Sequence, residues 1–218
     1  MRVITGSAKG HRLKTPKSDR TRPMLEKVRG SLFAVLEGYL GEISGQVLDL
    51  YAGSGSLGIE ALSRGAEWAD FVEINAGACR VIRENLEHTH LAERGHVYHA
   101  RVQSYLRRMH QGEKYDIIFL DPPYADTAIG ETLAEVAGSP VVHGETLVAV
   151  HHAVRVALGE AYGPLRLLER RRLGDSVYCI YGMPEWWEQD AGEAGQSGGG
   201  EEEAAPGALS ESLSKEDL

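Results

Sequence analysis

Short apolar runs alternate with longer segments of helical periodicity between residues 45 and 183, an order typical of parallel βαβ units. The expected strands are residues 46–51, 69–74, 96–100, 115–120 and 145–151, and the expected helices are 57–64, 76–89, 103–110 and 129–137. Two further runs, 165–172 and 176–181, are separated by Leu173-Gly174-Asp175, which suits an antiparallel hairpin. The pattern predicts an α/β protein with a doubly wound, Rossmann-like sheet, mostly parallel with a C-terminal antiparallel hairpin.

Two segments flank this alternating region. Residues 2–5 and 11–14 predict a small β-hairpin, and residues 23–40 have the apolar spacing of a helix. From Glu188 onward the sequence is mostly Gly, Ala and acidic residues, which cannot bury enough apolar surface to order themselves. We therefore expect a basic N-terminal extension over 1–40, one folded domain over 41–187 and a disordered acidic tail over 188–218.

The net charge of −9 is distributed unevenly. The first 29 residues contain nine basic and two acidic residues, whereas the residues from Glu188 contain one basic and nine acidic residues. A local basic potential attracts polyanions whatever the total charge, but a solvated basic segment without a partner has the same composition. Charge alone therefore leaves a nucleic-acid partner open.

The sequence predicts no membrane segment, disulfide or metal site. Its longest apolar runs are far too short to cross a bilayer, and the basic N-terminus has no apolar stretch behind it. Cys79 and Cys179 lack C-x-x-C spacing, and the neighbouring histidines lack the spacing of metal ligands. We therefore expect a cytoplasmic protein.

The loop after the first expected strand has the composition of a cofactor site. Gly53 and Gly55 permit positive φ angles and close approach to the backbone, and the helix that begins near Ser56 offers unpaired N–H groups. Glu73 follows 20 residues after Gly53, at the end of the second expected strand, where its carboxylate can accept hydrogen bonds from ribose hydroxyls. The spacing indicates a ribose-containing cofactor, with a purely structural glycine turn as the alternative.

Two cofactors share these requirements. Residues 53–58 match G-x-G-x-x-G, the pattern of nicotinamide dinucleotide sites. Asp49 favours S-adenosylmethionine, because a carboxylate at this strand end can hold a cationic amino group and would repel a pyrophosphate. A carboxylate that only holds the turn is the alternative for Asp49.

Asp121-Pro122-Pro123-Tyr124 follows the fourth expected strand and lies at the same sheet edge as the cofactor loop. An exocyclic amine conjugated to an aromatic base is a poor nucleophile, so methyl transfer requires acceptors for its hydrogens. The Asp121 carboxylate and the Pro122 carbonyl can serve, and the prolines fix the backbone. Tyr124 offers a flat face on which an extruded base can stack. The tetrapeptide therefore indicates methyl transfer to a nucleobase amine.

These motifs resemble the DPPY class of S-adenosylmethionine-dependent methyltransferases and, within it, the RsmD family of 16S ribosomal RNA guanine-N2 methyltransferases. The likeness extends from Met1 to about Tyr181. It rests on the sequence at residues 2–6, 9–13, 22–23, 28–29, 32–33, 51–66 and 121–124. The N-terminal block separates this family from other DPPY enzymes.

The resemblance implies S-adenosylmethionine as cofactor and small-subunit ribosomal RNA as substrate. The predicted cofactor-binding residues are Asp49, Tyr51, Ala52, Gly53, Ser54, Gly55, Glu73, Gln103 and Asp121. The predicted catalytic residues are Asp121, Pro122, Pro123 and Tyr124. The predicted RNA-binding residues are Lys9, Arg12, Lys14, Arg22 and Arg29. We expect a monomer that acts on ribosomal RNA within an assembling or assembled small subunit.

The chain departs from the family pattern at three places. Met24 and Gly30 stand where the family usually has Thr and Glu. Arg101-Val102 stands where related chains usually have Asp-Ala or Asn-Ala, so the contact to adenine falls to the backbone or to Gln103.

Three other functions remain open from the sequence. A DPPY enzyme that methylates adenine N6 in RNA or DNA would use the same acceptor motif. A nicotinamide-dependent oxidoreductase would explain residues 53–58 but not residues 121–124. A non-catalytic RNA-binding module would have no use for an intact cofactor loop and acceptor motif.

Overall fold

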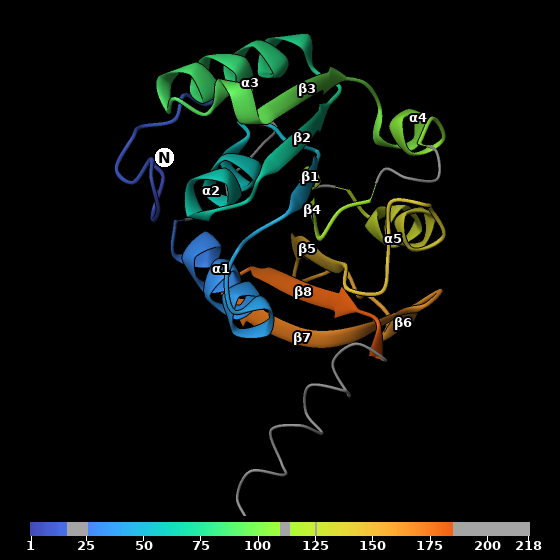
Figure 1. Ribbon diagram of the computed structural model, residues 1–218. Helices are drawn as coiled ribbons and strands as arrows, with labels where there is room; N and C mark the ends of the chain where they lie inside the picture. Colours follow the sequence, from blue (N-terminus) through green and yellow to red (C-terminus); the bar gives the residue numbers. More distant parts are fainter. Residues whose placement is uncertain (17–25, 110–113, 125, 185–218) are drawn as a thin grey trace, which may run out of the picture.

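One mixed sheet runs through the protein (Figure 1), whose computed structural model describes residues 1–16, 26–109, 114–124 and 126–184. The strands of these residues are β1 (Gln46–Leu50), β2 (Trp68–Glu73), β3 (Gly95–His99), β4 (Ile117–Leu120), β5 (Leu147–Ala153), β6 (Ala161–Tyr162), β7 (Leu165–Leu173) and β8 (Ser176–Gly182). The helices are α1 (Glu26–Leu40), α2 (Ser56–Arg64), α3 (Ala76–His88), α4 (Val102–Leu106) and α5 (Ile129–Ala137), with a 3-10 turn η1 (Ala92–Arg94).

The strand order is β3-β2-β1-β4-β5-β8-β7-β6. Strands β1 to β5 are parallel, and β8 is antiparallel to both β5 and β7. The predicted fold class is confirmed, whereas β6 was not predicted because two residues show no periodicity. Strand β1 pairs with β2 on one side and β4 on the other, so the chain order reverses there. The carboxyl ends of β1 and β4 therefore mark the expected ligand site of such a sheet.

Helices cover both faces of the sheet (Figure 1). Helices α1, α2 and α3 pack on one face, in a cluster where the rings of Phe33 and Phe119 lie 5.5 Å apart. Helices α4 and α5 pack on the other face, against residues such as Leu50 and Leu120. All four residues of β4 are buried, as expected for a parallel strand covered on both sides. In the part of the chain that the structure describes, no helix is both long and apolar enough to span a membrane.

The first 16 residues pack against α2. One antiparallel bridge between Arg2 and Arg12 replaces the predicted two-stranded hairpin. Gly6 has a φ of +85°, and a Cβ at this position would clash with the carbonyl of Ser63 at the end of α2. The hydroxyl of Ser63 accepts the N–H of Ala8 at 2.9 Å. The glycine therefore permits a close approach that holds the N-terminal turn against the domain.

Glu60 of α2 and Arg29 of α1 form a fully buried ion pair, with 3.6 Å between Glu60 Oε2 and Arg29 Nε. The Glu60 carboxylate also accepts the N–H groups of Ile4 and Thr5 at 2.8 and 3.0 Å. Arg29 donates to the carbonyl of Arg2. Burial lowers the pKa of Arg29, and the nearby Glu60 opposes this shift. The pair therefore fastens residues 2–5 to two helices.

Asn85 of α3 connects the N-terminal segment, at Lys14, with the loop after β1. Its Nδ2 donates to the carbonyls of Ser54 and Lys14 at 2.9 and 3.0 Å, and its Oδ1 accepts the N–H of Lys14 at 2.8 Å. This amide is buried and fully hydrogen-bonded, which is the usual state of a buried polar group. The N-terminal segment and the loop therefore share one anchor.

Some predicted boundaries differ from the structure. The helix expected at 103–110 already ends at Leu106, and the strand expected at 145–151 continues to Ala153. The predicted tail, 188–218, and Arg22 lie outside the described residues.

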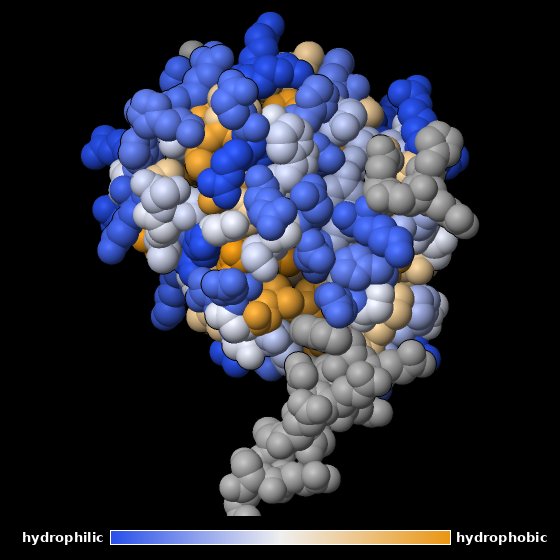
Figure 2. Space-filling model, in the orientation of Figure 1, coloured by the Kyte–Doolittle hydropathy of each residue, from blue (hydrophilic) through white to orange (hydrophobic). Residues whose placement is uncertain are grey.

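On the face seen in Figure 2, hydrophilic side chains predominate and apolar residues show only in small patches.

Candidate functional site

The loop between β1 and α2 has the backbone that its glycines predict. Gly53 and Gly55 have φ angles of +57° and +77°, and Tyr51 is also at positive φ, +62°. A Cβ on Gly58, inside α2, would clash with the ring of Phe71 on β2. The glycines thus allow a tight loop and a helix that lies close to the sheet.

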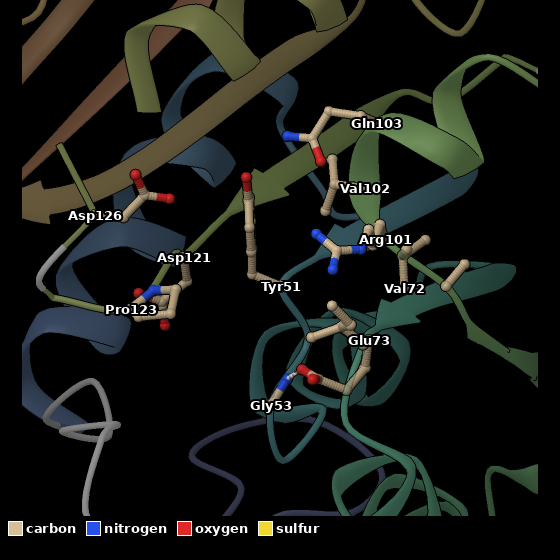
Figure 3. A pocket seen from close by; sticks show the side chains of 12 residues that line it. Tyr51, Gly53, Val72, Glu73, Arg101, Val102, Gln103, Asp121, Pro123 and Asp126 are labelled. Carbon is tan, nitrogen blue, oxygen red and sulfur yellow. Dashed lines mark hydrogen bonds between the residues drawn. The ribbon is translucent and has the colours of Figure 1, made fainter. Parts of the chain in front are cut away.

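A pocket of about 300 Å³ opens beside this loop, at the carboxyl ends of β1, β2 and β4 (Figure 3). It is lined by Tyr51, Gly53, Val72, Glu73, Ile74, Ala100, Arg101, Val102, Gln103, Asp121, Pro123 and Asp126. We call it the cofactor pocket. Of the predicted cofactor-binding residues it brings together Tyr51, Gly53, Glu73, Gln103 and Asp121, whereas Ala52, Ser54 and Gly55 lie in the loop without lining it.

The carboxylate of Glu73 is fixed at the end of β2. Its Oε2 accepts the N–H of Gly53 at 2.9 Å, and its Oε1 accepts the N–H of Asn75 at 2.7 Å. Each carboxylate oxygen can accept more than one hydrogen bond, so both remain able to accept from a hydroxyl group. The side chain is therefore oriented before a ligand arrives.

Asp49 lies beneath the loop and does not line the pocket. Its Oδ2 accepts the N–H of Gly58 at 3.0 Å, and its Oδ1 has no hydrogen-bond partner among the described residues. Burial raises the pKa of Asp49 well above its ordinary value. The geometry agrees with the alternative in which this carboxylate holds the turn, and its contact with a cofactor stays a prediction.

One wall of the cofactor pocket is a small polar network. The hydroxyl of Thr132 on α5 lies 3.1 Å from the hydroxyl of Tyr51 and accepts from Nε2 of Gln103 at 3.4 Å. Burial raises the pKa of the Tyr51 hydroxyl, so this group stays protonated at neutral pH. Three elements are joined in this wall: the end of β1, helix α4 and helix α5.

Ile74 is a pocket residue that the sequence did not single out. Its side chain is 54% exposed, the largest exposure of a large apolar residue in the part of the chain described. Together with Val102 it gives the cofactor pocket an apolar surface. An exposed branched residue directly after a buried strand was the available signal.

A second, smaller hollow of about 20 Å³ adjoins the cofactor pocket, and we call it the acceptor hollow. It is lined by Asp121, Pro122, Pro123, Tyr124, Asp126, His151, His152 and Ala153. Asp121, Pro123 and Asp126 border both spaces. The four predicted catalytic residues are thus brought together at the end of β4, next to the cofactor pocket.

The ring of Tyr124 is held from two sides. Its hydroxyl donates to the carbonyl of Asp175, in the turn between β7 and β8, at 3.1 Å. The guanidinium of Arg155 lies 4.8 Å from the ring centroid and donates to the Tyr124 carbonyl at 2.8 Å. The C-terminal hairpin therefore helps to place the aromatic face.

His151 is the main residue that sequence reasoning missed. Its Nδ1 lies 2.7 Å from Oδ1 of Asp121. In the sequence it is only one of several neighbouring histidines without a metal-ligand spacing. Its place at the carboxyl end of the strand beside β4 was the signal, because parallel strand ends meet at one edge.

The predicted RNA-binding residues separate into two groups. Lys9, Arg12 and Lys14 are exposed on the N-terminal turn, and Lys14 forms an ion pair with Glu84 at 2.7 Å. Arg29 is fully buried against Glu60, so its predicted contact with RNA is wrong. A charged residue buried in an ion pair has no surface to offer a polyanion.

Comparisons with known proteins cover most of the chain. A family model described as conserved hypothetical protein 95 matches residues 1–182. YlbH of Bacillus subtilis is 35% identical over 185 residues, 83% of this chain and 98% of YlbH. Ribosomal RNA small subunit methyltransferase D of Escherichia coli is 30% identical over 191 residues, 88% of this chain and 94% of that protein.

Solved structures agree with these matches. A hypothetical protein of Thermus thermophilus superimposes with a TM-score of 0.71 at 31% identity, over 83% of this chain and 98% of its own. An RNA methyltransferase from Salinibacter ruber, solved in complex with S-adenosyl-L-homocysteine, has a TM-score of 0.56 at 14% identity over 75% of this chain and 95% of its own. The second similarity concerns the fold alone.

Proposed function

The chain belongs to the conserved hypothetical protein 95 family, the RsmD family of methyltransferases, and on this premise we propose that it methylates the exocyclic N2 amine of a guanine in small-subunit ribosomal RNA. The methyl donor is S-adenosylmethionine, and the fold is that of class I methyltransferases. The observation that supports the proposal most directly is the position of Asp121, which borders both the cofactor pocket and the acceptor hollow. A carboxylate there lies between a bound donor and its acceptor.

The residues of the cofactor pocket fit S-adenosylmethionine. Glu73 presents a fixed carboxylate for the ribose hydroxyls, and Ile74 and Val102 offer apolar surface to the adenine. Three carboxylates, of Glu73, Asp121 and Asp126, and the one guanidinium of Arg101 line the pocket. This charge balance favours a sulfonium over a pyrophosphate and argues against a nicotinamide dinucleotide. When bound, the sulfonium supplies an electrophilic methyl group.

The acceptor hollow suits an amine on a flat ring. The base would stack on Tyr124, whose ring is held by Asp175 and Arg155. The Asp121 carboxylate and the Pro122 carbonyl would accept the two amine hydrogens, leaving the nitrogen lone pair directed at the methyl group. These acceptors raise the reactivity of a conjugated amine that would otherwise be a poor nucleophile.

The N-terminal turn supplies a basic surface for RNA. Lys9, Arg12 and Lys14 are exposed on it, and its position is fixed by Glu60, Ser63 and Asn85. We propose a monomer that binds RNA presented by a small-subunit particle, because the described basic surface is modest and ribosomal proteins would complete it.

The test is to identify the methylated nucleoside. Purified protein is incubated with labelled S-adenosylmethionine and small-subunit particles lacking the modification, and the RNA is digested and analysed. We expect labelled N2-methylguanosine. N6-methyladenosine would overturn the choice of base, and absence of label with cofactor binding confirmed would overturn the choice of substrate.

Two variants connect the result to the site. Asp121→Ala should lower transfer by about 100-fold or more, the scale of removing a group that acts in the transition state, with cofactor affinity changed only a few-fold. Asp121→Asn keeps the size of the side chain but has one acceptor oxygen instead of two and cannot take up the proton, so it should also lower transfer strongly. Equal transfer by wild type and Asp121→Ala would remove this residue from the chemistry.

A further inference from the structure

His151 lies directly behind the acceptor carboxylate. Leu120 and Val150 are paired in the β4–β5 register, so Asp121 and His151 are the next residues along two neighbouring strands. Nδ1 of His151 and Oδ1 of Asp121 are 2.7 Å apart. The His151 side chain is 11% exposed and that of Asp121 is 26% exposed. The imidazole is therefore enclosed while the carboxylate remains accessible to a ligand.

The tautomer of His151 follows from its partners. Nε2 is buried and has no hydrogen-bond partner among the described residues. With the proton on Nδ1, the imidazole donates to Asp121 and leaves only an unpaired acceptor at Nε2. With the proton on Nε2, a buried donor would be unpaired, and two lone pairs would face each other at 2.7 Å. The neutral ring therefore has its proton on Nδ1.

We propose that His151 is a positioning residue for methyl transfer: its Nδ1–H holds Oδ1 of Asp121 and directs Oδ2 to the acceptor amine. The inference rests on the proposed function, since it assigns a task to the same acceptor site. Among the described residues, none forms a hydrogen bond with Oδ2 of Asp121, and Asp121 borders both the cofactor pocket and the acceptor hollow. Fixing one oxygen leaves the other free for the substrate.

The chemical step balances with these groups. The amine lone pair forms the new N–C bond while the C–S bond of the sulfonium breaks, and the C–S electron pair stays on sulfur. The methylated nitrogen then loses one proton to Oδ2 of Asp121, which can release it to solvent because the carboxylate is partly exposed. His151 remains hydrogen-bonded to Oδ1 throughout.

Other titratable groups surround the pair. Asp121, Tyr124 and Asp126 line the hollow from the β4 side, Tyr178 of β8 lies opposite His151 in the sheet, and Arg155 stacks on Tyr124. His152 is the neighbouring histidine, and its pKa is lowered by burial. It therefore stays neutral at the pH values at which an ordinary histidine begins to protonate.

The test compares the kinetics of methyl transfer at one pH in four proteins: wild type, His151→Asn, His151→Ala and the control His143→Asn. Asn places an amide donor near the position of Nδ1, whereas Ala has no donor. His143 is the matched control because it also pairs with an aspartate, Asp116, at 3.2 Å. This pair lies at the amino ends of β4 and β5, away from the acceptor hollow.

We expect His151→Asn to keep activity within a few-fold of wild type, because its amide can still donate to Oδ1 of Asp121. His151→Ala should lower kcat by about 10-fold or more, with the substrate KM changed little. His143→Asn should transfer at the wild-type rate. Equal rates for His151→Asn and His151→Ala, or a wild-type rate for His151→Ala, would overturn the proposal.

A second measurement does not depend on activity. Nitrogen NMR of the protein labelled at histidine, with S-adenosylhomocysteine bound, reports the tautomer of each ring. We expect the Nδ1–H form for His151 and its loss in Asp121→Ala; an Nε2–H form in wild type would overturn the inference. If wild type transfers no methyl group to ribosomal RNA, the proposed function is wrong. The NMR measurement still tests whether the Nδ1–H of His151 holds Asp121.

Discussion

The Glu73 carboxylate accepts the backbone N–H of Gly53 at 2.9 Å, so the end of β2 orients the loop that follows β1. The sequence shows only that Glu73 follows Gly53 by 20 positions. The hydrogen bond shows that the loop and the carboxylate form one surface. A ribose that binds Glu73 meets a side chain whose rotamer is already fixed, which reduces the entropy lost on binding.

Replacing Glu73 should weaken cofactor binding. Glu73→Gln keeps the size of the side chain but exchanges one acceptor oxygen for a donor, which would face the N–H of Asn75 or Gly53. We expect the Kd for S-adenosylmethionine to rise about 10- to 100-fold, measured by isothermal titration calorimetry, since each factor of ten is about 1.4 kcal/mol. Glu67→Gln, at an exposed site just before β2, is the control and should leave the Kd unchanged. Equal affinities for Glu73→Gln and wild type would contradict the assignment.

The buried ion pair between Arg29 and Glu60 should stabilise the fold only when both charges are present. Arg29→Met leaves the buried Glu60 carboxylate with Arg64, 3.0 Å from its Oε1, as its remaining cation. We expect the free energy of unfolding to fall by about 3 kcal/mol in urea denaturation. Arg29→Met combined with Glu60→Leu removes both charges and should lose less than the sum of the two single changes. Additive losses would show that the two side chains act independently.

Stability should also depend on pH through Asp49. Because burial raises the pKa of this carboxyl, the folded protein binds its proton more tightly than the unfolded chain does. The free energy of unfolding then decreases as the pH rises above about 4, the ordinary pKa of Asp. Asp49→Asn has no ionisable carboxyl at this position. The free energy of unfolding of Asp49→Asn minus that of wild type should therefore become more positive as the pH rises from about 4.5 to about 8. Urea denaturation at several pH values measures this difference, and a difference that does not change with pH would contradict the ionisation of a buried Asp49.

RNA binding should depend on the exposed part of the N-terminal turn. Lys9→Ala and Arg12→Ala should each weaken binding to small-subunit particles several-fold and reduce the slope of log affinity against log salt by about one. Lys114→Ala, at an exposed position next to β4, serves as the control. Unchanged salt slopes in both variants would place the RNA on another face.

The sequence predicted the fold and the outline of the site because both depend on local signals. The alternation of apolar runs and helical segments predicts parallel strands connected by helices. The glycine loop and residues 121–124 each follow a strand directly. The pairing of their carboxyl ends then places them at one edge. The assignment of individual cofactor contacts stays a prediction.

What the sequence could not predict depends on contacts between distant segments. Arg29 lies in a strongly basic stretch, which predicts a surface residue, yet its partner Glu60 belongs to the next helix and buries it. His151 has meaning only through Asp121, 30 residues earlier, on the neighbouring strand. No periodicity or spacing within either segment reveals such a pair.

The contact of Gly58 with the Phe71 ring also constrains how this protein can change over generations. A methyl group at position 58 would have to displace an aromatic ring that is fully buried between α2 and the sheet. Whether a substitution is tolerated at position 58 therefore depends on the side chain at position 71. An alanine at 58 becomes acceptable only after Phe71 has been replaced by a smaller residue, and a return to phenylalanine at 71 is then blocked. Mutational drift near the cofactor loop should proceed in such ordered pairs rather than residue by residue.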